Sequence, residues 1–392
     1  MATLLLMVIY LAFISLGVPD SLLGTAWPVV YREFGVPLSF ASVVGIVCSF
    51  ATMTSSMNSA RIISRFGTGK VAAFSTLLTA MALLGYSFTG SFWMMLVLAI
   101  PLGLGAGCID AALNNYVSLH YNATVMSFLH CFYGVGVMVS PYIMSLVISG
   151  EQGWRGGYRM ASLIQCVIGV LLILALPLWQ KAHGAEAIQA EKRMKVLPIR
   201  ETLRIPGALM TCLLFLTFCV IEVICGGWSA TYMVEARGVA ADLGARATMF
   251  FYLGMALGRF LSGVVAKKLT PWQIILISLG LLGVALVTLL LAGSNTLTIA
   301  ALLLAGLGVG PLYPNFNYMT PLNFGKDVSQ SVMGMQMTFA SIGTITAPLV
   351  CGLLGQTLGM GIFPYFLLVF YILTLVGIVL LRRTLRAQGK MG

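Results

Sequence analysis

Twelve long apolar segments occupy nearly the whole of this 392-residue chain and are separated mostly by short polar connections. A helix that crosses a membrane needs about 20 consecutive apolar residues, because the hydrocarbon layer is about 30 Å thick. Only 8% of the residues are charged, whereas soluble domains have roughly 25%. We therefore expect an all-α membrane protein with twelve transmembrane helices. The predicted spans are residues 4–30, 39–60, 70–90, 93–117, 125–149, 157–179, 207–233, 245–267, 272–292, 296–319, 329–356 and 361–381.

The longest polar stretch, residues 180–204, separates the first six spans from the last six. We therefore expect an N-terminal six-helix bundle at residues 1–180, a cytoplasmic linker at 181–206 and a C-terminal six-helix bundle at 207–392. The first span has neither a basic leader nor a small-residue cleavage site, so we expect it to be retained rather than removed as a signal peptide.

The basic residues predict how the chain is oriented in the membrane. Sixteen Lys and Arg residues fall in the linker, in the C-terminal tail and in the connections on the same side, whereas five fall on the other side. Positively charged connections remain in the cytoplasm, so we expect both termini and the linker to be cytoplasmic. The five residues on the other side are Arg32, Arg155, Arg159, Arg237 and Arg246.

The two halves of the chain also repeat each other. Gly103-Leu-Gly-Ala-Gly107 recurs as Gly306-Leu-Gly-Val-Gly310 at an offset of 203, and Asn114 falls on Asn317 at the same offset. Further matches occur in the same order at nearly the same offset, which indicates duplication. Two parallel repeats of six helices, related by an axis along the membrane normal, are typical of one large class of transporters. The further matches are Asp20 and Gly24 with Glu222 and Gly226, and Phe132, Gly136 and Pro141 with Phe339, Gly343 and Pro348.

Several other classes of protein are excluded. The eight cysteines fall in or beside apolar runs without a CxxC pair, which predicts free thiols and neither a disulfide framework nor a metal site. The chain has no Walker loop, HExxH or GxSxG motif, so we expect no enzymatic activity and no cofactor. The net charge of +11 lies in the connections, where it sets topology. We therefore expect no nucleic-acid partner, only the lipid bilayer and a small molecule.

Three acidic residues, Asp20, Asp110 and Glu222, lie within the spans, where an ionisable group is costly unless it faces a cavity or a partner. Asp110 is the best candidate for proton coupling, because apolar surroundings favour the protonated form of a carboxyl group. Its alternative role is a structural acid paired with the embedded Arg259. Asp20 follows Pro19, so it is either a proton or cation site or the acceptor that closes a broken helical turn. Glu222 either binds a cation or a substrate hydroxyl, or bonds to another helix.

Polar and aromatic residues of the same spans form the candidate substrate site. His130 either hydrogen-bonds the substrate or relays a proton, or else has a packing role. Trp27 and Trp228 either stack on a sugar ring or belong to an aromatic belt at the membrane surface. Amides with aromatic rings suit a neutral polyhydroxylated ligand, whereas an anion calls for basic residues. The other candidates are Asn114, Asn115, Tyr133, Tyr313, Asn317 and Gln336.

Twelve spans with a long central linker resemble the major facilitator superfamily. The segments Arg61…Arg65-Phe-Gly67 and Gly258-Arg259…Gly263 are similar to degenerate forms of the loop motif that follows the second and eighth spans in that family. The resemblance implies two pseudo-symmetric six-helix bundles and a gating or structural role for Arg61 and Arg259. The first copy of the motif lacks the usual acid and the leading glycines.

More narrowly, Gly107-Cys-Ile-Asp-Ala-Ala-Leu-Asn114 resembles the fourth-span motif of the fucose:proton symporter family. Asp20, followed by Gly24 and Pro28, is similar to the first span of that family. The resemblance implies that Asp110 is the protonatable acid and that Asp20 is a second acid in the cavity. Fucose carriers usually have Glu where this chain has Asp110.

These observations predict a secondary active transporter that moves a small polar solute, above all a sugar, by proton-coupled alternating access. The alternatives are sodium-coupled sugar uptake, an exporter of drugs, metabolites or lipids on the same fold, and a receptor that binds a nutrient without transporting it. We expect a multi-pass monomer in the inner (plasma) membrane, with H⁺ as the coupling ion and Na⁺ as the other candidate.

Overall fold

The computed structural model of this chain describes residues 2–120, 123–181 and 197–387, and every regular element in these ranges is a helix. The predicted all-α class is confirmed. Within these ranges eleven segments are long and apolar enough to cross a membrane, and a twelfth apolar segment, Phe40–Ser56, is shorter. The helices are α1 (Ala2–Gly17), α2 (Leu22–Glu33), α3 (Phe40–Phe66), α4 (Thr68–Ser87), α5 (Phe92–His120), α6 (Ala123–Val147), α7 (Gly153–Leu174), α8 (Leu176–Lys181), α10 (Ile199–Arg204), α11 (Ala208–Arg237), α12 (Ala241–Val265), α13 (Pro271–Leu291), α14 (Asn295–Val309), α15 (Leu312–Phe324), α16 (Lys326–Leu358), η2 (Met360–Ile362) and α17 (Phe363–Ala387).

The end of α3 is set by a glycine rather than by the end of the apolar run. The second span is predicted to end at residue 60, but α3 continues to Phe66. Small polar residues and arginines do not interrupt a helix, so the polar end of this span stays helical. Gly67 follows with a φ of +81°, a conformation that glycine adopts without strain. The helix therefore extends beyond the predicted span, and its apolar part is Phe40–Ser56.

The first span is broken at the proline that its sequence contains. Residues 18–21, which include Pro19, separate α1 from α2, because proline has no N–H group to donate and its ring clashes with the preceding turn. A carbonyl group freed by such a break needs a new partner inside a membrane. The Val18 carbonyl accepts a hydrogen bond from the Ser140 hydroxyl of α6. The break is thereby fixed to a neighbouring helix.

The two glycine runs that repeat in the sequence make equivalent contacts. A Cβ at Gly103 would lie 2.2 Å from the Cys48 carbonyl oxygen of α3, and a Cβ at Gly306 would lie 2.0 Å from the Phe251 carbonyl oxygen of α12. Both the glycines and their contacts are 203 residues apart. No side chain fits at so short a distance from a backbone, so these glycines set the spacing of α5 and α14 from their neighbours.

The middle glycines of the two runs repeat this pattern on another pair of helices. A Cβ at Gly105 or at Gly308 would lie 2.8 Å from the carbonyl oxygen of Ser75 in α4 or of Ser278 in α13, respectively. These contacts also keep the offset of 203 residues. The repeated sequence therefore reproduces the same three-helix contact in both halves of the chain.

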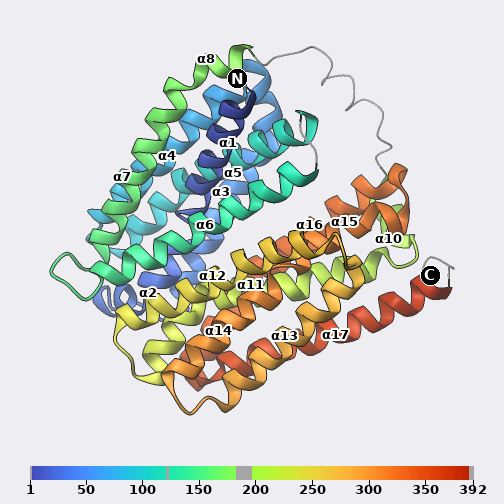
Figure 1. The fold of residues 1–392 in the computed structure, drawn as a ribbon. Coiled ribbons are helices and arrows are strands. Elements are labelled where there is room, and N and C mark those ends of the chain that lie inside the picture. The colour runs from blue at the N-terminus through green and yellow to red at the C-terminus, as the bar shows by residue number, and fades with distance from the viewer. Residues whose placement is uncertain (1, 121–122, 182–196, 388–392) are drawn as a thin grey trace.

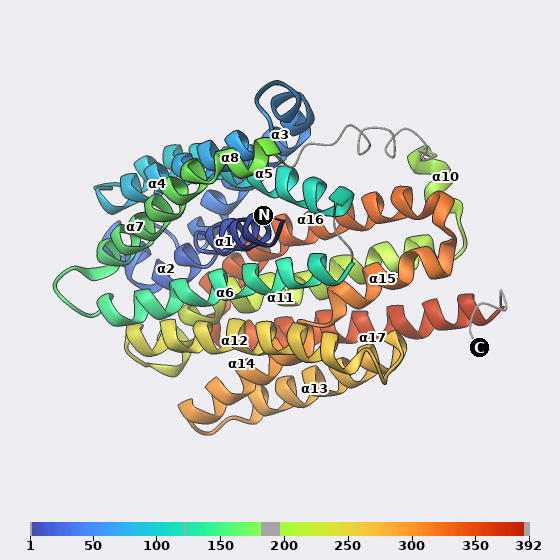
Figure 2. The same cartoon turned by 45° about the horizontal axis from the view of Figure 1, so that its top comes forward.

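The helices form two groups. Figure 1 shows α1–α8 as one group, coloured blue to green, and α10–α17 as a second group, coloured yellow-green to red; Figure 2 shows the same division from another direction. We call them the first group and the second group. The described chain ends lie on the side of the molecule where α8 ends and α10 begins (Figure 1), which we call the linker end.

The two groups contact each other along α6 and α12 and at the end opposite the linker end. Gly24 of α2 meets α11 so closely that a Cβ there would lie 2.6 Å from the Gly227 carbonyl oxygen. The Ser39 hydroxyl, just before α3, donates to the side-chain oxygen of Gln356 in α16 over 3.0 Å. Both contacts are at or towards the opposite end, which is therefore held together across the groups.

The glycine contacts give a test of the packing. The substitution Gly306→Ala places a methyl group 2.0 Å from a backbone oxygen, which cannot move aside as a flexible side chain would. We expect a loss of stability of about 1–3 kcal/mol, as for other overpacked positions, visible as a lower midpoint of thermal unfolding in detergent.

Gly280→Ala is the matched control, because nothing lies within 4 Å of a Cβ at this position in α13. Alanine has the higher helix propensity, so the midpoint should stay the same or rise. Equal losses for the two variants would contradict a packing role for Gly306.

Candidate functional site

Ionisable and hydroxyl side chains from both groups gather between the groups. Asp20, in the break of the first span, and Asp110, in α5, both have exposed side chains and interact electrostatically with each other. Each also interacts with a tyrosine of the second group: Asp20 with Tyr252 of α12, and Asp110 with Tyr313 of α15. The two carboxylates therefore face the space between the groups rather than lipid. We call Asp20, Asp110, Tyr133, Glu222, Tyr252 and Arg259 the central cluster.

Asp20 is bonded to a different helix. Its carboxylate accepts a hydrogen bond from the Tyr133 hydroxyl of α6. The turn at the break closes through the backbone instead, because the Asp20 N–H donates to the Gly17 carbonyl over 3.3 Å. The carboxylate is therefore not the acceptor that closes the broken turn, which was one of its two predicted roles. A neutral phenol as partner leaves the charge of the carboxylate uncompensated.

Asp110 is paired within its own helix. The Asn114 side-chain amide donates to the Asp110 carboxylate over 2.8 Å and to the Asp110 backbone carbonyl over 3.1 Å. The two residues are one helical turn apart, so they share a face of α5. The alternative in which Arg259 pairs with Asp110 is not the arrangement found. Like Asp20, Asp110 has a neutral hydrogen-bond partner and space in front of it.

Glu222 differs, because it has a cation as partner. Arg259 Nη2 of α12 lies 3.2 Å from Glu222 Oε1 of α11, with the two side chains 10% and 25% exposed. The Nε of Arg259 also donates to the Gly310 carbonyl over 3.4 Å. That carbonyl cannot have its usual helical donor, because Pro314, four residues on, has no N–H group. Arg259 therefore joins three helical segments, and the bond between helices is the role that the structure gives Glu222.

Tyr252 is a member of the cluster that sequence reasoning missed. A Cβ at Gly226 would lie 2.0 Å from the Tyr252 hydroxyl oxygen, so this glycine makes room for the phenol. Besides Asp20, the hydroxyl interacts electrostatically with Glu222 and Arg259. The only signal in the sequence is a tyrosine inside an apolar span opposite a glycine that belongs to the repeat.

His130 lies beside the cluster. Its ring meets the Phe13 ring edge-on, with 5.9 Å between centroids, and it interacts electrostatically with Arg259. The packing contact agrees with the structural alternative for His130. The position next to Arg259 keeps it at the border of the space between the groups.

Trp27 and Trp228 are both buried, with 0% and 2% exposure. The Trp27 indole donates to the Leu38 carbonyl over 2.7 Å. The Trp228 ring lies 2.8 Å from the position of a Cβ on Gly352 of α16. In this arrangement neither ring has a free face for a sugar, and neither faces outward as an aromatic belt would. Both pack near the opposite end.

The candidates of the tenth and eleventh spans have distinct surroundings. The Tyr313 hydroxyl lies 3.2 Å from the Met337 sulfur. The Asn317 side-chain oxygen is buried without a hydrogen-bond partner among the described residues. A buried acceptor without a donor destabilises the folded state. Gln336 is fully buried and exchanges hydrogen bonds with the Thr320 hydroxyl. The Asn317 side-chain oxygen therefore keeps unused polar capacity, whereas the Tyr313 hydroxyl has partners in Met337 and Asn317 and Gln336 is engaged in packing.

The side chains of Asn115 and Arg61 lie outside the described residues. In the described part of the chain, no group of three or more His, Cys, Asp or Glu side chains is placed to hold a metal ion. The chemistry of the central cluster is thus that of carboxyl groups, phenols and one neutralised guanidinium.

Three proteins with related sequences span most of the chain. The glucose/mannose transporter GlcP of Bacillus subtilis is 22% identical over 96% of this chain and 94% of its own length. The 3-(3-hydroxy-phenyl)propionate transporter of Escherichia coli is 22% identical over 74% of this chain and 71% of its own. Bypass of stop codon protein 6 of Saccharomyces cerevisiae is 20% identical over 90% of this chain and 77% of its own.

A solved structure has the same fold. It is a bacterial homolog of the human lysosomal transporter Spinster, in an inward-facing and occupied conformation, and it superposes with a TM-score of 0.74 over 98% of this chain and 97% of its own at 11% identity. The sequence profile of the Major Facilitator Superfamily matches residues 9–348 and 240–390. The predicted superfamily is thus confirmed: the chain is a multi-pass membrane protein that belongs to the major facilitator superfamily of transporters.

Proposed function

We propose that this protein is a secondary active transporter that moves a small neutral solute, above all a sugar, by proton-coupled alternating access in the plasma membrane. The halves, residues 1–180 and 207–392, act as two bodies related by a pseudo-two-fold axis, joined by a cytoplasmic linker, with both termini cytoplasmic. The protein works as a monomer. The repeated glycine contacts at an offset of 203 residues support the axis, and the distribution of basic residues supports the orientation.

One observation carries the proposal of proton coupling: two carboxylates in the space between the groups have only neutral hydrogen-bond partners. Asp20 is bonded to Tyr133 and Asp110 to Asn114, whereas Glu222 is neutralised by Arg259. An uncompensated carboxylate in apolar surroundings is stabilised by taking up a proton. The proton then removes a charge from the space between two moving bodies, which changes the free-energy difference between their arrangements.

The contacts between the groups support alternating access. At the opposite end, Arg32 of α2 lies 2.7 Å from Glu235 of α11, and the Tyr31 hydroxyl donates to the same carboxylate over 2.8 Å. Under the proposed orientation this end is extracellular and closed. A reciprocal state requires these contacts to separate while the linker end closes.

The substrate is proposed from the groups left free around the cluster. The charge of Arg259 is neutralised by Glu222. Among the described residues, the cluster therefore has no uncompensated cation that could bind an anionic solute. Phenols and amides such as Tyr313 and Asn317 suit hydroxyl groups. The Bacillus subtilis relative, named as a glucose/mannose transporter, covers nearly the whole chain. The fourth-span motif, which resembles that of the fucose:proton symporters, also supports a sugar. Sodium coupling and export of other solutes are the alternatives.

Asp110→Asn tests the coupling. The amide has nearly the same shape but cannot exchange a proton, so we expect proton-driven uptake into proteoliposomes to fall at least tenfold while counterflow exchange persists. Counterflow needs only the substrate-loaded protein to change state, which does not require a free carboxylate. Uptake at the wild-type rate would overturn the role of Asp110.

A matched control for this test is Asp242→Asn. Asp242 lies in the first turn of α12 and is paired at 3.8 Å with Arg246 on the protein surface. Such a pair contributes little, so uptake should be unchanged. An equal loss in the control would mean that the assay reports reduced folding or insertion rather than coupling.

Glu222→Gln separates structure from coupling. Removing the acid leaves Arg259 with its charge largely buried, which destabilises by about 2 kcal/mol once the partial exposure of the pair is allowed for. We expect a lower midpoint of thermal unfolding, and recovery of most of it in the double variant Glu222→Gln/Arg259→Gln. An unchanged midpoint together with lost proton-driven uptake would instead assign coupling to Glu222.

A ligand panel tests the substrate class. Monosaccharides, an aromatic acid and a hydrophobic amine are compared for counterflow and for thermal stabilisation, at two pH values and with or without sodium. We expect a sugar to give both effects, with proton-dependent and sodium-independent uptake. Stabilisation by the amine alone would favour an exporter, and binding of a sugar without counterflow would favour a receptor.

A further inference from the structure

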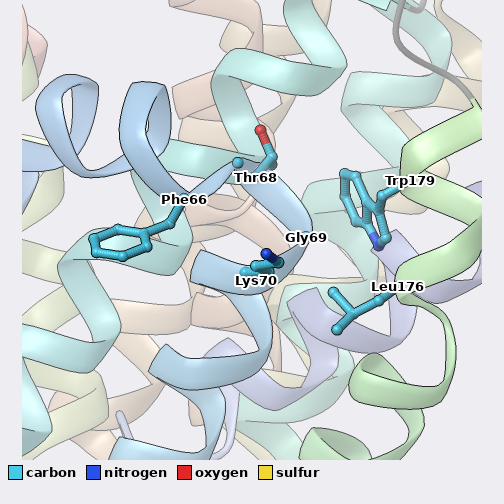
Figure 3. Close-up of a pocket in the computed structure, with 7 residues that line it drawn as sticks. Phe66, Thr68, Gly69, Lys70, Leu176 and Trp179 are labelled. Carbon is cyan, nitrogen blue, oxygen red and sulfur yellow. The ribbon is translucent and has the colours of Figure 1, made fainter.

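A separate cavity of about 330 Å³ lies at the linker end. It is formed where α3 ends, α4 begins and α8 packs against them, and its lining includes Phe66, Lys70, Leu176 and Trp179 (Figure 3). None of these residues belongs to the central cluster. The cavity is therefore a site distinct from the proposed transport pathway.

The start of α4 supplies free donors to this cavity. The first N–H groups of any α-helix have no partner within the helix, and here the capping residue is Gly67, which has no side chain to bond to them. The helix is 20 residues long, so its N-terminus carries a partial positive charge that attracts anions. This helix start is thus open, with its donors uncapped by a side chain.

Trp179 of α8 contributes a second, independent feature. The residue is only 3% exposed, and its indole nitrogen has no hydrogen-bond partner among the described residues. A Cβ at Gly69 would lie 2.6 Å from Cγ and 2.8 Å from Cδ1 of the indole. The Nε1 atom is bonded to Cδ1, so the N–H lies beside the first turn of α4. A buried donor without an acceptor is costly, which points to an acceptor that the protein itself does not provide.

Lys70 is the charged residue of the lining, and the lining has no acid. Its side chain is exposed and lies on the first turn of α4 beside Gly69 (Figure 3). Phe66, on the other side of the cavity, is 54% exposed, and Phe74, two turns into α4, is 69% exposed. Outward-facing aromatic side chains on a spanning helix lie in lipid, so the cavity is at the level of the membrane surface.

The second group closes the equivalent helix start with its own side chains. Thr270, which is 203 residues after Gly67, caps α13 by a capping box with Gln273, and Pro271 at the first position has no N–H group. Gln273 also occupies the position equivalent to Lys70. The N–H groups at the start of α13 are therefore bonded by the side chains of the second group. At the start of α4 the corresponding N–H groups have no side-chain cap, and a lysine stands where α13 has Gln273.

We propose that the cavity at the start of α4 binds a phosphate group, carried either by an anionic membrane lipid or by a free phosphate ester. The phosphate oxygens accept hydrogen bonds from the first N–H groups of α4 and from the Trp179 indole, and Lys70 supplies the opposite charge. In the lipid case Phe66 and Leu176 contact the glycerol and acyl portion.

Thermal unfolding of the purified full chain in detergent tests this proposal. Dioleoylphosphatidylglycerol, dioleoylglycerol with the same acyl chains but no phosphate, and glycerol 3-phosphate are each titrated. We expect the phospholipid to raise the unfolding midpoint with a saturable concentration dependence, and dioleoylglycerol to raise it much less. An added effect of glycerol 3-phosphate would assign the site to free phosphate esters as well; its absence would assign it to lipid.

Three variants locate the effect. Lys70→Gln should raise the apparent Kd about tenfold or more, because a charge-assisted bond is lost. Trp179→Phe keeps an aromatic ring but no donor and should raise it about fivefold. Lys268→Gln removes an exposed charge from the corresponding connection of the second group and should bind as the wild type does.

Three results would overturn the proposal: equal stabilisation by dioleoylglycerol, wild-type binding by Lys70→Gln, or an equal loss in Lys268→Gln, which would indicate a general effect of surface charge. If Trp179→Phe does not unfold cooperatively, the exposed Lys70 and its control decide the matter.

Discussion

A polar group without a partner is costly inside an apolar helix bundle, and this constraint accounts for the central arrangement of the protein. The break at residues 18–21 persists because α6 supplies a hydroxyl to the Val18 carbonyl. The Gly310 carbonyl, whose helical donor position is a proline, is satisfied by Arg259 instead. Each break is therefore held by a side chain of a particular neighbouring helix.

The same constraint separates the three embedded acids by role. Glu222 is held by a cation at 3.2 Å, so the removal of either partner would leave the other unpaired. Asp20 and Asp110 have only neutral hydrogen-bond partners, so no opposite charge holds either carboxylate in the charged form. An acid suited to carrying a proton is one whose charged and neutral forms are both accessible. By this argument Glu222 has a structural role, and the proposed coupling role falls to the two aspartates.

Much of the fold is predictable from the sequence because it depends on local properties. Apolar runs determine the spans, Pro19 determines the first break, and the glycine runs determine which helices approach closely. The partners of the site residues are not predictable in this way. Arg259 has three embedded acids as candidate partners, and which of them it contacts depends on how α12 is rotated about its axis. The depth of Trp27 and Trp228 likewise depends on helices distant in sequence, so residue type alone suggests a ligand contact or a membrane belt.

The repeated glycine contacts make the positions where the two halves differ informative. Glycines such as Gly105 and Gly308 make equivalent contacts, so the two halves share backbone geometry at these positions, and a residue that differs there is not required by packing. Asp110 faces the space between the groups, and Tyr313 stands at the equivalent position of the repeat, so at this position only the first half has an acid. Gly67 likewise stands where the repeat has Thr270, and the helix start that it leaves open is free to bind an anion. Comparing the halves therefore separates scaffold from site without any other sequence.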